Sequence, residues 1–176
     1  MEEIRNNRLE KLKLLKDKGI DAYPATTKRE YYLSEVVADF EELSKKESLI
    51  LAGRVMAIRP QGGLVFLNIY DGTSLFQGLL KKDEIEASVF DFFSQVVDIG
   101  DFIEVSGSLF ITKRNEKTIK IRDWKILSKS LRPLPEKWHG LQDEEEKLRK
   151  RYLDILFNPE IRDMIEKRAK FWSAMR

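Results

Sequence analysis

The sequence contains no cysteine and a single histidine among 176 residues. The absence of cysteine excludes disulfides, thiolate nucleophiles and cysteine-based zinc sites, and it is typical of proteins in a reducing compartment. His139 has neither a second imidazole nor a serine or cysteine partner motif, so we expect a structural hydrogen bond from it in a hinge. The sequence therefore predicts no metal site and no catalytic residue in this chain.

Long apolar segments are also missing. No apolar run approaches the roughly 20 residues that a transmembrane helix requires. The opening MEEIRNNRLEKLKLL has neither the apolar core nor the cleavage site of a signal peptide. Neither a G-x-G-x-x-G motif nor a Walker-type loop is present. We expect a soluble, cytoplasmic protein without a membrane partner.

Charge is nearly balanced over the chain, with 32 basic and 30 acidic residues, so the net charge does not indicate a nucleic-acid partner. The segment from Leu109 to Arg132 differs, because Glu116 and Asp123 are its only acidic residues. Its excess of basic residues predicts a positive stripe that could contact phosphates. These residues are Lys113, Arg114, Lys117, Lys120, Arg122, Lys125, Lys129 and Arg132.

Five segments have the composition of β-strands, because they are rich in β-branched and aromatic residues and are bounded by turn residues. Gly62-Gly63 and Asp71-Gly72 supply tight turns between the first three, and Lys113 to Glu116 joins the last two. The predicted strands span residues 49–59, 64–70, 74–80, 102–112 and 118–127.

Helical spacing of apolar residues surrounds and interrupts this region. Residues 3–18 form a predicted helix that ends at Gly19, and a second short helix begins at the N-cap Ser34. A further helix over residues 81–97 separates the third strand from the fourth. Three strands, a helix and two strands is the order of an OB-fold, a five-stranded barrel whose second and third strands and adjoining loops form its usual nucleic-acid face.

A hinge and a second domain are predicted after the barrel. Pro133 and Pro135 favour extended backbone and oppose helix, whereas residues 143–157 and 159–176 return to helical spacing. We divide the chain into an N-terminal helical extension (1–48), a barrel (49–128), a hinge (129–142) and the start of a further domain (143–176). The last helix has an apolar stripe with no partner in the chain, formed by Ile161, Ile165, Trp172 and Met175.

Four stretches of the sequence resemble class II lysyl-tRNA synthetases of the bacterial type. LAGRVMAIRPQGGLVFLNIYDG is similar to the first two barrel strands of that family and DIGDFIEVSGSLFITKRNEKTIKI to the last two. SKSLRPLPEKWHGLQDEE and RKRYLDIL are similar to its hinge and to the entry of its catalytic domain. The hinge phrase is the most specific of the four. The resemblance implies mainly β structure with helices, in which the OB-fold is followed by a truncated α/β class II synthetase domain.

The resemblance also implies roles for individual residues in anticodon binding. Phe66 corresponds to the aromatic residue that stacks on the middle anticodon base. Gln77 and Glu116 correspond to the residues that read the edge of that base, and Arg59 to a basic residue that assists them. The chemistry is suitable, since an aromatic ring can stack on any base while amide and carboxylate groups distinguish base edges. Phosphate contacts are expected from Lys113, Arg114, Lys117 and Lys120.

Each of these residues also has a structural interpretation. Phe66 could belong to the barrel core, Gln77 could be an outward-facing structural residue, and Glu116 could be a solvated turn residue. The basic residues could form a solvated hairpin. For Arg149, Lys150 and Arg151 we favour salt bridges with Glu144 to Glu146 over a catalytic role.

The part of the resembled family that performs catalysis is largely missing. Only the first helix of its motif 1 has a counterpart here, and motifs 2 and 3, which hold ATP and magnesium, have none. We therefore expect this segment alone to be inactive and to bind no cofactor. In a full-length enzyme the resemblance implies a homodimer that attaches lysine to its tRNA, using ATP and magnesium through a lysyl-adenylate.

Three alternatives remain open on the sequence. The chain could be a free-standing OB-fold module that binds tRNA or single strands without catalysis. It could be the anticodon domain of an aspartyl- or asparaginyl-tRNA synthetase, which share the barrel and a phrase similar to RYLD. It could also be a regulatory or scaffold protein whose barrel binds protein, in which case salt-dependent tRNA binding is not expected.

Overall fold

The structure is a computed structural model that describes residues 2–135 and 143–176. The chain divides into two compact units, Met1–Pro133 and Leu134–Arg176. The central part of the predicted hinge, including His139, lies outside the described residues. No helix in the described ranges combines the length and the hydrophobicity needed to traverse a lipid bilayer.

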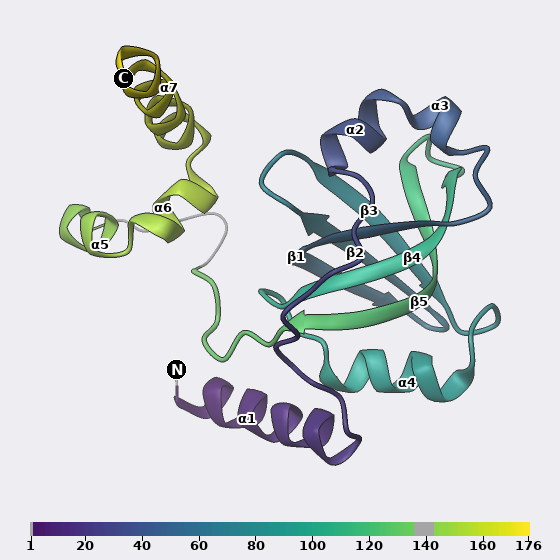
Figure 1. Cartoon of the computed structure of the whole chain (residues 1–176). Helices are drawn as coiled ribbons and strands as arrows, with labels where there is room; N and C mark the ends of the chain where they lie inside the picture. The colour runs from purple at the N-terminus through teal and green to yellow at the C-terminus, as the bar shows by residue number, and fades with distance from the viewer. Residues whose placement is uncertain (1, 136–142) are drawn as a thin grey trace. The chain divides into compact units, whose positions relative to one another are not determined.

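Five strands close into a barrel in the first unit, as the sequence predicts (Figure 1). Their order around the barrel is β1-β2-β3-β5-β4, and every pair is antiparallel except β3 with β5. The strands are β1 (Leu49–Gln61), β2 (Leu64–Tyr70), β3 (Leu75–Lys81), β4 (Phe102–Ile111) and β5 (Lys117–Ser128).

The barrel interior follows from the alternation of side chains along the strands. On β2, for example, Val65, Leu67 and Ile69 are buried and belong to the continuous hydrophobic core. The two strands approach closely where the pairing of β4 with β5 shifts register beside Gly107. A Cβ atom there would lie 1.8 Å from the carbonyl oxygen of Lys120, so only glycine allows the two strands to approach.

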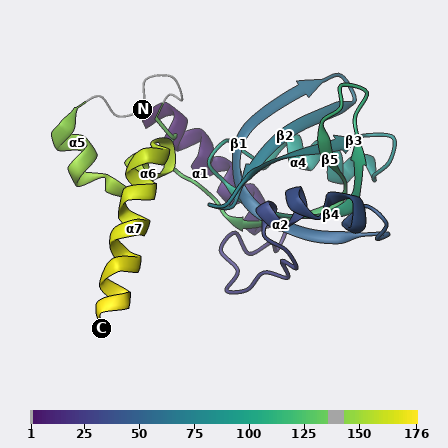
Figure 2. The same ribbon diagram turned by 90° about the horizontal axis from the view of Figure 1, so that it is seen from above.

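Helices cover two opposite sides of the barrel (Figures 1 and 2). One side carries α1 (Glu2–Asp17) packed against α4 (Ala87–Val96), and the other carries α2 (Leu33–Ala38) and α3 (Phe40–Leu43). Phe93 of α4 meets Trp124 of β5 edge to face, with ring centroids 5.1 Å apart. Aromatic pairs of this kind add to the apolar burial and hold the helix on the barrel.

Two predicted helices differ from those observed. The helix expected over residues 81–97 begins only at Ala87, because residues 82–85 form a turn after β3. The helix expected from Ser34 begins at Leu33 after the N-cap Tyr32, whose amide donates to the Glu35 carboxylate over 2.6 Å. A glutamate at the third helical position can cap a helix in this way. The prediction of Ser34 as the N-cap did not take this role of Glu35 into account.

The second unit contains α5 (Glu144–Arg149), α6 (Arg151–Phe157) and α7 (Pro159–Met175). The helix expected over residues 143–157 is therefore divided, because the backbone at Lys150 leaves the helical region with φ −113° and ψ 45°. Arg149 and Lys150 form salt bridges one turn back, to Glu145 and Glu146. The salt-bridge interpretation is confirmed for those two residues.

The other basic residue of that group behaves differently. Arg151 pairs with Asp154 of its own helix over 2.7 Å, so the expected partners Glu144 to Glu146 are wrong for it. Along α7, Ile161 and Ile165 are half-buried, whereas Trp172 and Met175 are exposed.

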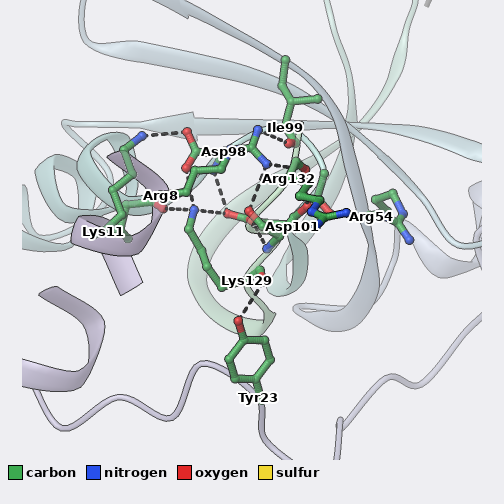
Figure 3. Close-up of polar contacts among 12 residues, drawn as sticks. Arg8, Lys11, Tyr23, Arg54, Asp98, Ile99, Asp101, Lys129 and Arg132 are labelled. Carbon is green, nitrogen blue, oxygen red and sulfur yellow. Dashed lines mark hydrogen bonds and ion pairs between the residues drawn. The ribbon is translucent and has the colours of Figure 1, made fainter. Parts of the chain in front are cut away.

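A buried ion cluster fixes the point where the chain leaves the barrel (Figure 3). The side chain of Lys129 is fully buried, and its Nζ donates to the carbonyl oxygen of Val96 and to the carboxylates of Asp98 and Asp101 over 2.6 to 2.7 Å. Three acceptors match the three hydrogens of an ammonium group. The sequence assigned Lys129 to the exposed positive stripe, and that assignment is wrong.

Two further basic residues, both on α1, complete the Lys129 cluster (Figure 3). Lys11 donates to Asp98 over 2.7 Å. Arg8, also buried, donates to the carbonyl oxygens of Ser130 and Arg132 over 2.9 and 3.0 Å. The cluster of Arg8, Lys11, Asp98, Asp101 and Lys129 therefore ties the first helix to the segment that follows β5.

We expect Lys129→Met to lower the free energy of unfolding by about 3–5 kcal/mol, because it removes the cation from two carboxylates and leaves Asp101 buried without it. The matched control is Lys125→Met on β5, four residues earlier in the chain, where the lysine is exposed. The control should change stability by less than about 0.5 kcal/mol. Urea unfolding of the two variants and the wild type measures both values, and equal stabilities of the variants would contradict this role for the cluster.

Stability should also depend on pH through Asp98. Burial opposes its charged form, but the hydrogen bonds from Lys11 and Lys129 outweigh burial and hold the pKa of Asp98 below its ordinary value. A carboxyl group with a lowered pKa stabilises the fold above its unfolded pKa and loses that contribution as the pH falls through the folded one. The free energy of unfolding should therefore decline below about pH 4.

Asp98→Asn should flatten this decline, whereas Asp91→Asn, at an exposed residue of α4, should leave it as in the wild type. Urea unfolding at pH 7 and pH 3 gives the required differences. The same pH dependence in Asp98→Asn and the wild type would show that Asp98 does not carry this contribution.

Candidate nucleic-acid interface

Phe66 lies on the outer face of the barrel. The buried residues Val65 and Leu67 flank it along β2 and point inward, so alternation places the half-buried Phe66 outward. It is absent from the hydrophobic core. The core interpretation of Phe66 is wrong, and the side chain is partly accessible.

Strand pairing brings the other predicted residues of the sheet next to Phe66. Its partner across β1 is Arg59, and its partner across β3 is Leu79. Two pairs further along, and so on the same face, Asn68 of β2 faces Gln77 of β3. Side chains at facing positions, and those two positions along on the same face, lie within reach of long side chains, so these residues form one patch of the outer face.

Hydrogen bonds connect the polar members of this patch. The Arg59 guanidinium donates through Nη2 to Gln77 Oε1 over 3.1 Å and to Asn68 Oδ1 over 3.5 Å. Gln77 in turn donates through Nε2 to the hydroxyl of Thr118 over 2.9 Å. Gln77 is therefore hydrogen-bonded at both ends of its amide.

Asn68 and Thr118 were not predicted as members of this site. Asn68 could have been found, because it lies two residues after Phe66 and so shares its face of the strand. Thr118 becomes a neighbour of Gln77 only through the parallel pairing of β3 with β5. No local pattern in the sequence indicates that pairing.

Glu116 lies in the turn that joins β4 to β5 and is exposed. The turn contains Asn115 in the left-handed region with φ 62°, a conformation that asparagine tolerates better than most residues. The hydroxyl of Thr112 accepts from the Glu116 amide over 3.1 Å. The Glu116 carbonyl oxygen accepts from the Thr118 hydroxyl over 3.1 Å, which links this turn to the network around Gln77.

The four predicted phosphate-binding residues lie in two different environments. Lys113 and Arg114 are exposed in the β4–β5 turn. Lys117 donates to the carbonyl oxygen of Val37 over 2.8 Å, and Lys120 pairs with Glu84 over 3.1 Å. Exposed ion pairs contribute only about 0–1 kcal/mol, so a phosphate could displace Glu84 from Lys120 at low cost.

The described residues contain no group of three or more histidine, aspartate or glutamate side chains placed to hold a metal ion. The patch offers an aromatic ring and an oriented amide, and Thr118 links it to the β4–β5 turn that carries Glu116, Lys113 and Arg114. Stacking, edge recognition and phosphate contact are the three interactions by which proteins hold single-stranded RNA.

Comparison with known proteins supports this assignment. Residues 49–127 match the family model described as an OB-fold nucleic acid binding domain. Over its whole length the chain is 42% identical to a lysine–tRNA ligase of Synechococcus sp. (strain CC9902), covering 36% of that protein. It is also 40% identical to the lysine–tRNA ligase of Pelotomaculum thermopropionicum, covering 34% of it.

The lysine–tRNA ligase of Roseiflexus sp. (strain RS-1) is 41% identical, with 36% of its length covered. The chain is homologous to the N-terminal region of lysine–tRNA ligases. The resemblance based on the four sequence stretches is thus confirmed. The chain spans about a third of the length of these lysine–tRNA ligases.

Proposed function

We propose that this chain recognises the anticodon of lysine tRNA as the N-terminal part of a lysine–tRNA ligase. The observation that carries the proposal is the outward-facing Phe66 beside the hydrogen-bonded Gln77, on an OB-fold homologous to lysine–tRNA ligases. The division of the chain at residues 48, 128 and 142 belongs to the same proposal.

In this proposal the middle anticodon base stacks on Phe66. An aromatic ring binds any of the four bases and contributes about 1–3 kcal/mol per base. Gln77 and Glu116 read the edge of the stacked base, because buried or oriented polar groups favour the base that matches them. Arg59 supports both functions, since its guanidinium donates to Asn68 and Gln77 and the residue pairs with Phe66 across β1 and β2.

The basic residues contribute affinity that does not depend on the base. Lys113 and Arg114 are exposed and can contact phosphates without giving up the hydrogen bonds that hold the fold. Lys117 and Lys120 are each engaged with the protein, so we assign them a smaller share. Phosphate binding by these side chains releases counterions from the RNA, and binding should therefore weaken as salt increases.

The parent enzyme in this proposal attaches lysine to its tRNA with ATP and magnesium, through a lysyl-adenylate, as a homodimer in the cytoplasm. ATP, magnesium and lysine would be held by parts of the enzyme that lie outside this chain. The 176-residue segment by itself would bind the anticodon without performing catalysis.

The stacking role predicts a loss of affinity in Phe66→Ala. The dissociation constant for a lysine anticodon stem-loop should rise about 5- to 150-fold, which corresponds to about 1–3 kcal/mol. Phe102→Ala is the control, because Phe102 is a half-buried aromatic residue of β4 that stacks on Arg54 instead. Fluorescence anisotropy titrations measure both variants, and equal losses in the two would exclude a stacking role specific to Phe66.

The phosphate role predicts a change in salt dependence. Replacing Lys113 and Arg114 together by alanine should weaken binding to matched and mismatched stem-loops alike. It should also reduce the slope of log K against log salt by about 0.7–0.9 for each phosphate that the variant no longer neutralises. The control is Lys125→Ala, an exposed lysine elsewhere on β5. An unchanged slope in the double variant would remove both residues from the phosphate-binding set.

A further inference from the structure

The amide of Gln77 is held in one orientation by two neighbours of opposite character. An amide presents an acceptor at one end and a donor at the other, and in an isolated glutamine the two ends can exchange places by rotation. Here Oε1 accepts from Arg59 over 3.1 Å and Nε2 donates to Thr118 over 2.9 Å. The amide keeps this orientation if neither Arg59 nor Thr118 can form a hydrogen bond with the reversed amide.

Arg59 cannot form a hydrogen bond with the reversed amide, because a guanidinium has only donors. Rotation of the Gln77 amide would place its Nε2 hydrogens against the Arg59 donors. On the other side, the Thr118 hydroxyl has one hydrogen, which it donates to the carbonyl oxygen of Glu116 over 3.1 Å. Its oxygen is therefore free only to accept, and the Gln77 Nε2 supplies the donor.

The burial of Thr118 strengthens this constraint. Its relative exposure is 0%, so water cannot reach the Thr118 hydroxyl to donate to it in place of Gln77 Nε2. If the Gln77 amide were reversed, the Thr118 hydroxyl would have to donate to Gln77 Oε1. The Glu116 carbonyl oxygen would then lose its hydroxyl donor. Thr118 and Arg59 consequently exclude the reversed amide from opposite sides.

We propose that Thr118 is a positioning residue that fixes the Gln77 amide and thereby lets it discriminate uracil from cytosine. This inference rests on the proposed function, in which Gln77 reads the base stacked on Phe66. A uracil edge presents an N3 hydrogen beside a carbonyl oxygen, whereas a cytosine edge presents an unprotonated N3 beside an amino group. The two edges have donor and acceptor in reverse order.

An amide that rotates freely would satisfy either edge. A fixed amide can match uracil, with N3–H donating to Oε1 and the carbonyl oxygen accepting from Nε2. For cytosine in the same stacked position, the acceptor N3 would face the acceptor Oε1, and the amino group would face the donor Nε2. Lysine anticodons have uridine at the middle position, so the orientation imposed by Thr118 favours the cognate base.

The test compares two stem-loops that differ only in uridine or cytidine at the middle anticodon position. We expect Thr118→Val to reduce the ratio of the two dissociation constants about fivefold, mainly by improving binding of the cytidine loop. The exposed Arg59 side chain can turn away from a reversed amide, whereas the buried Thr118 cannot. Thr118→Ser keeps the hydroxyl and should retain the wild-type ratio. Improved binding of the wrong base is a result that general destabilisation of the barrel does not produce.

A second comparison determines whether Thr118 acts through Gln77. In a Gln77→Ala background, Thr118→Val should cause no further change in the ratio, because the amide that it orients is gone. Thr118→Ala removes the same hydroxyl and provides the measurement if the valine variant does not fold.

Three results would overturn the inference, and they separate it from the function on which it rests. A wild type without preference for uridine overturns both the inference and base reading by the patch. A wild type that prefers uridine, together with hydroxyl-free variants of unchanged preference, overturns the role of Thr118 alone. Equal loss of affinity for both loops in Thr118→Val and Thr118→Ala would show that the threonine is structural.

Discussion

The parallel pairing of β3 with β5 closes the barrel and creates the environment of Gln77. Thr118 lies 41 residues after Gln77 in the chain, and this pairing brings its hydroxyl to Gln77 Nε2. The other pairings are antiparallel and place Arg59, Phe66 and Asn68 side by side. Closure of the barrel thus brings the patch on β1, β2 and β3 next to the Thr118 hydroxyl of β5, a strand that is distant in the sequence.

The Lys129 cluster shows a different use of polar groups. Burying an ammonium group is expensive unless every hydrogen and every nearby charge has a partner, and Lys129 has three acceptors within 2.7 Å. The same carboxylates reach α1 through Lys11 and hold Ser130 through its amide, which donates to Asp101 over 2.8 Å. The result is a fixed exit from β5, so the segment up to Pro133 leaves the barrel from a defined place.

Sequence patterns were sufficient for features that depend on neighbouring residues. The β-branched and aromatic composition and the turn residues located all five strands. The outward direction of Phe66 was left open and follows from the alternation along β2. Features that depend on distant contacts were missed. Lys129 looked like part of an exposed basic stripe, because Asp98 and Asp101 meet it only after α4 has packed on the barrel. Thr118 had no visible function for the same reason. The break at Lys150 was missed because apolar spacing continues through it.

The central claim, that the outer face of β1, β2 and β3 holds a lysine anticodon, is tested most directly by NMR. Backbone amide signals of the chain would be followed during addition of a lysine anticodon stem-loop. The account predicts that the largest shifts and line broadening fall on residues 59–68, 77–79 and 113–118, with little change along α1 and α4. Changes centred on α1 and α4, or spread evenly over the barrel, would contradict it.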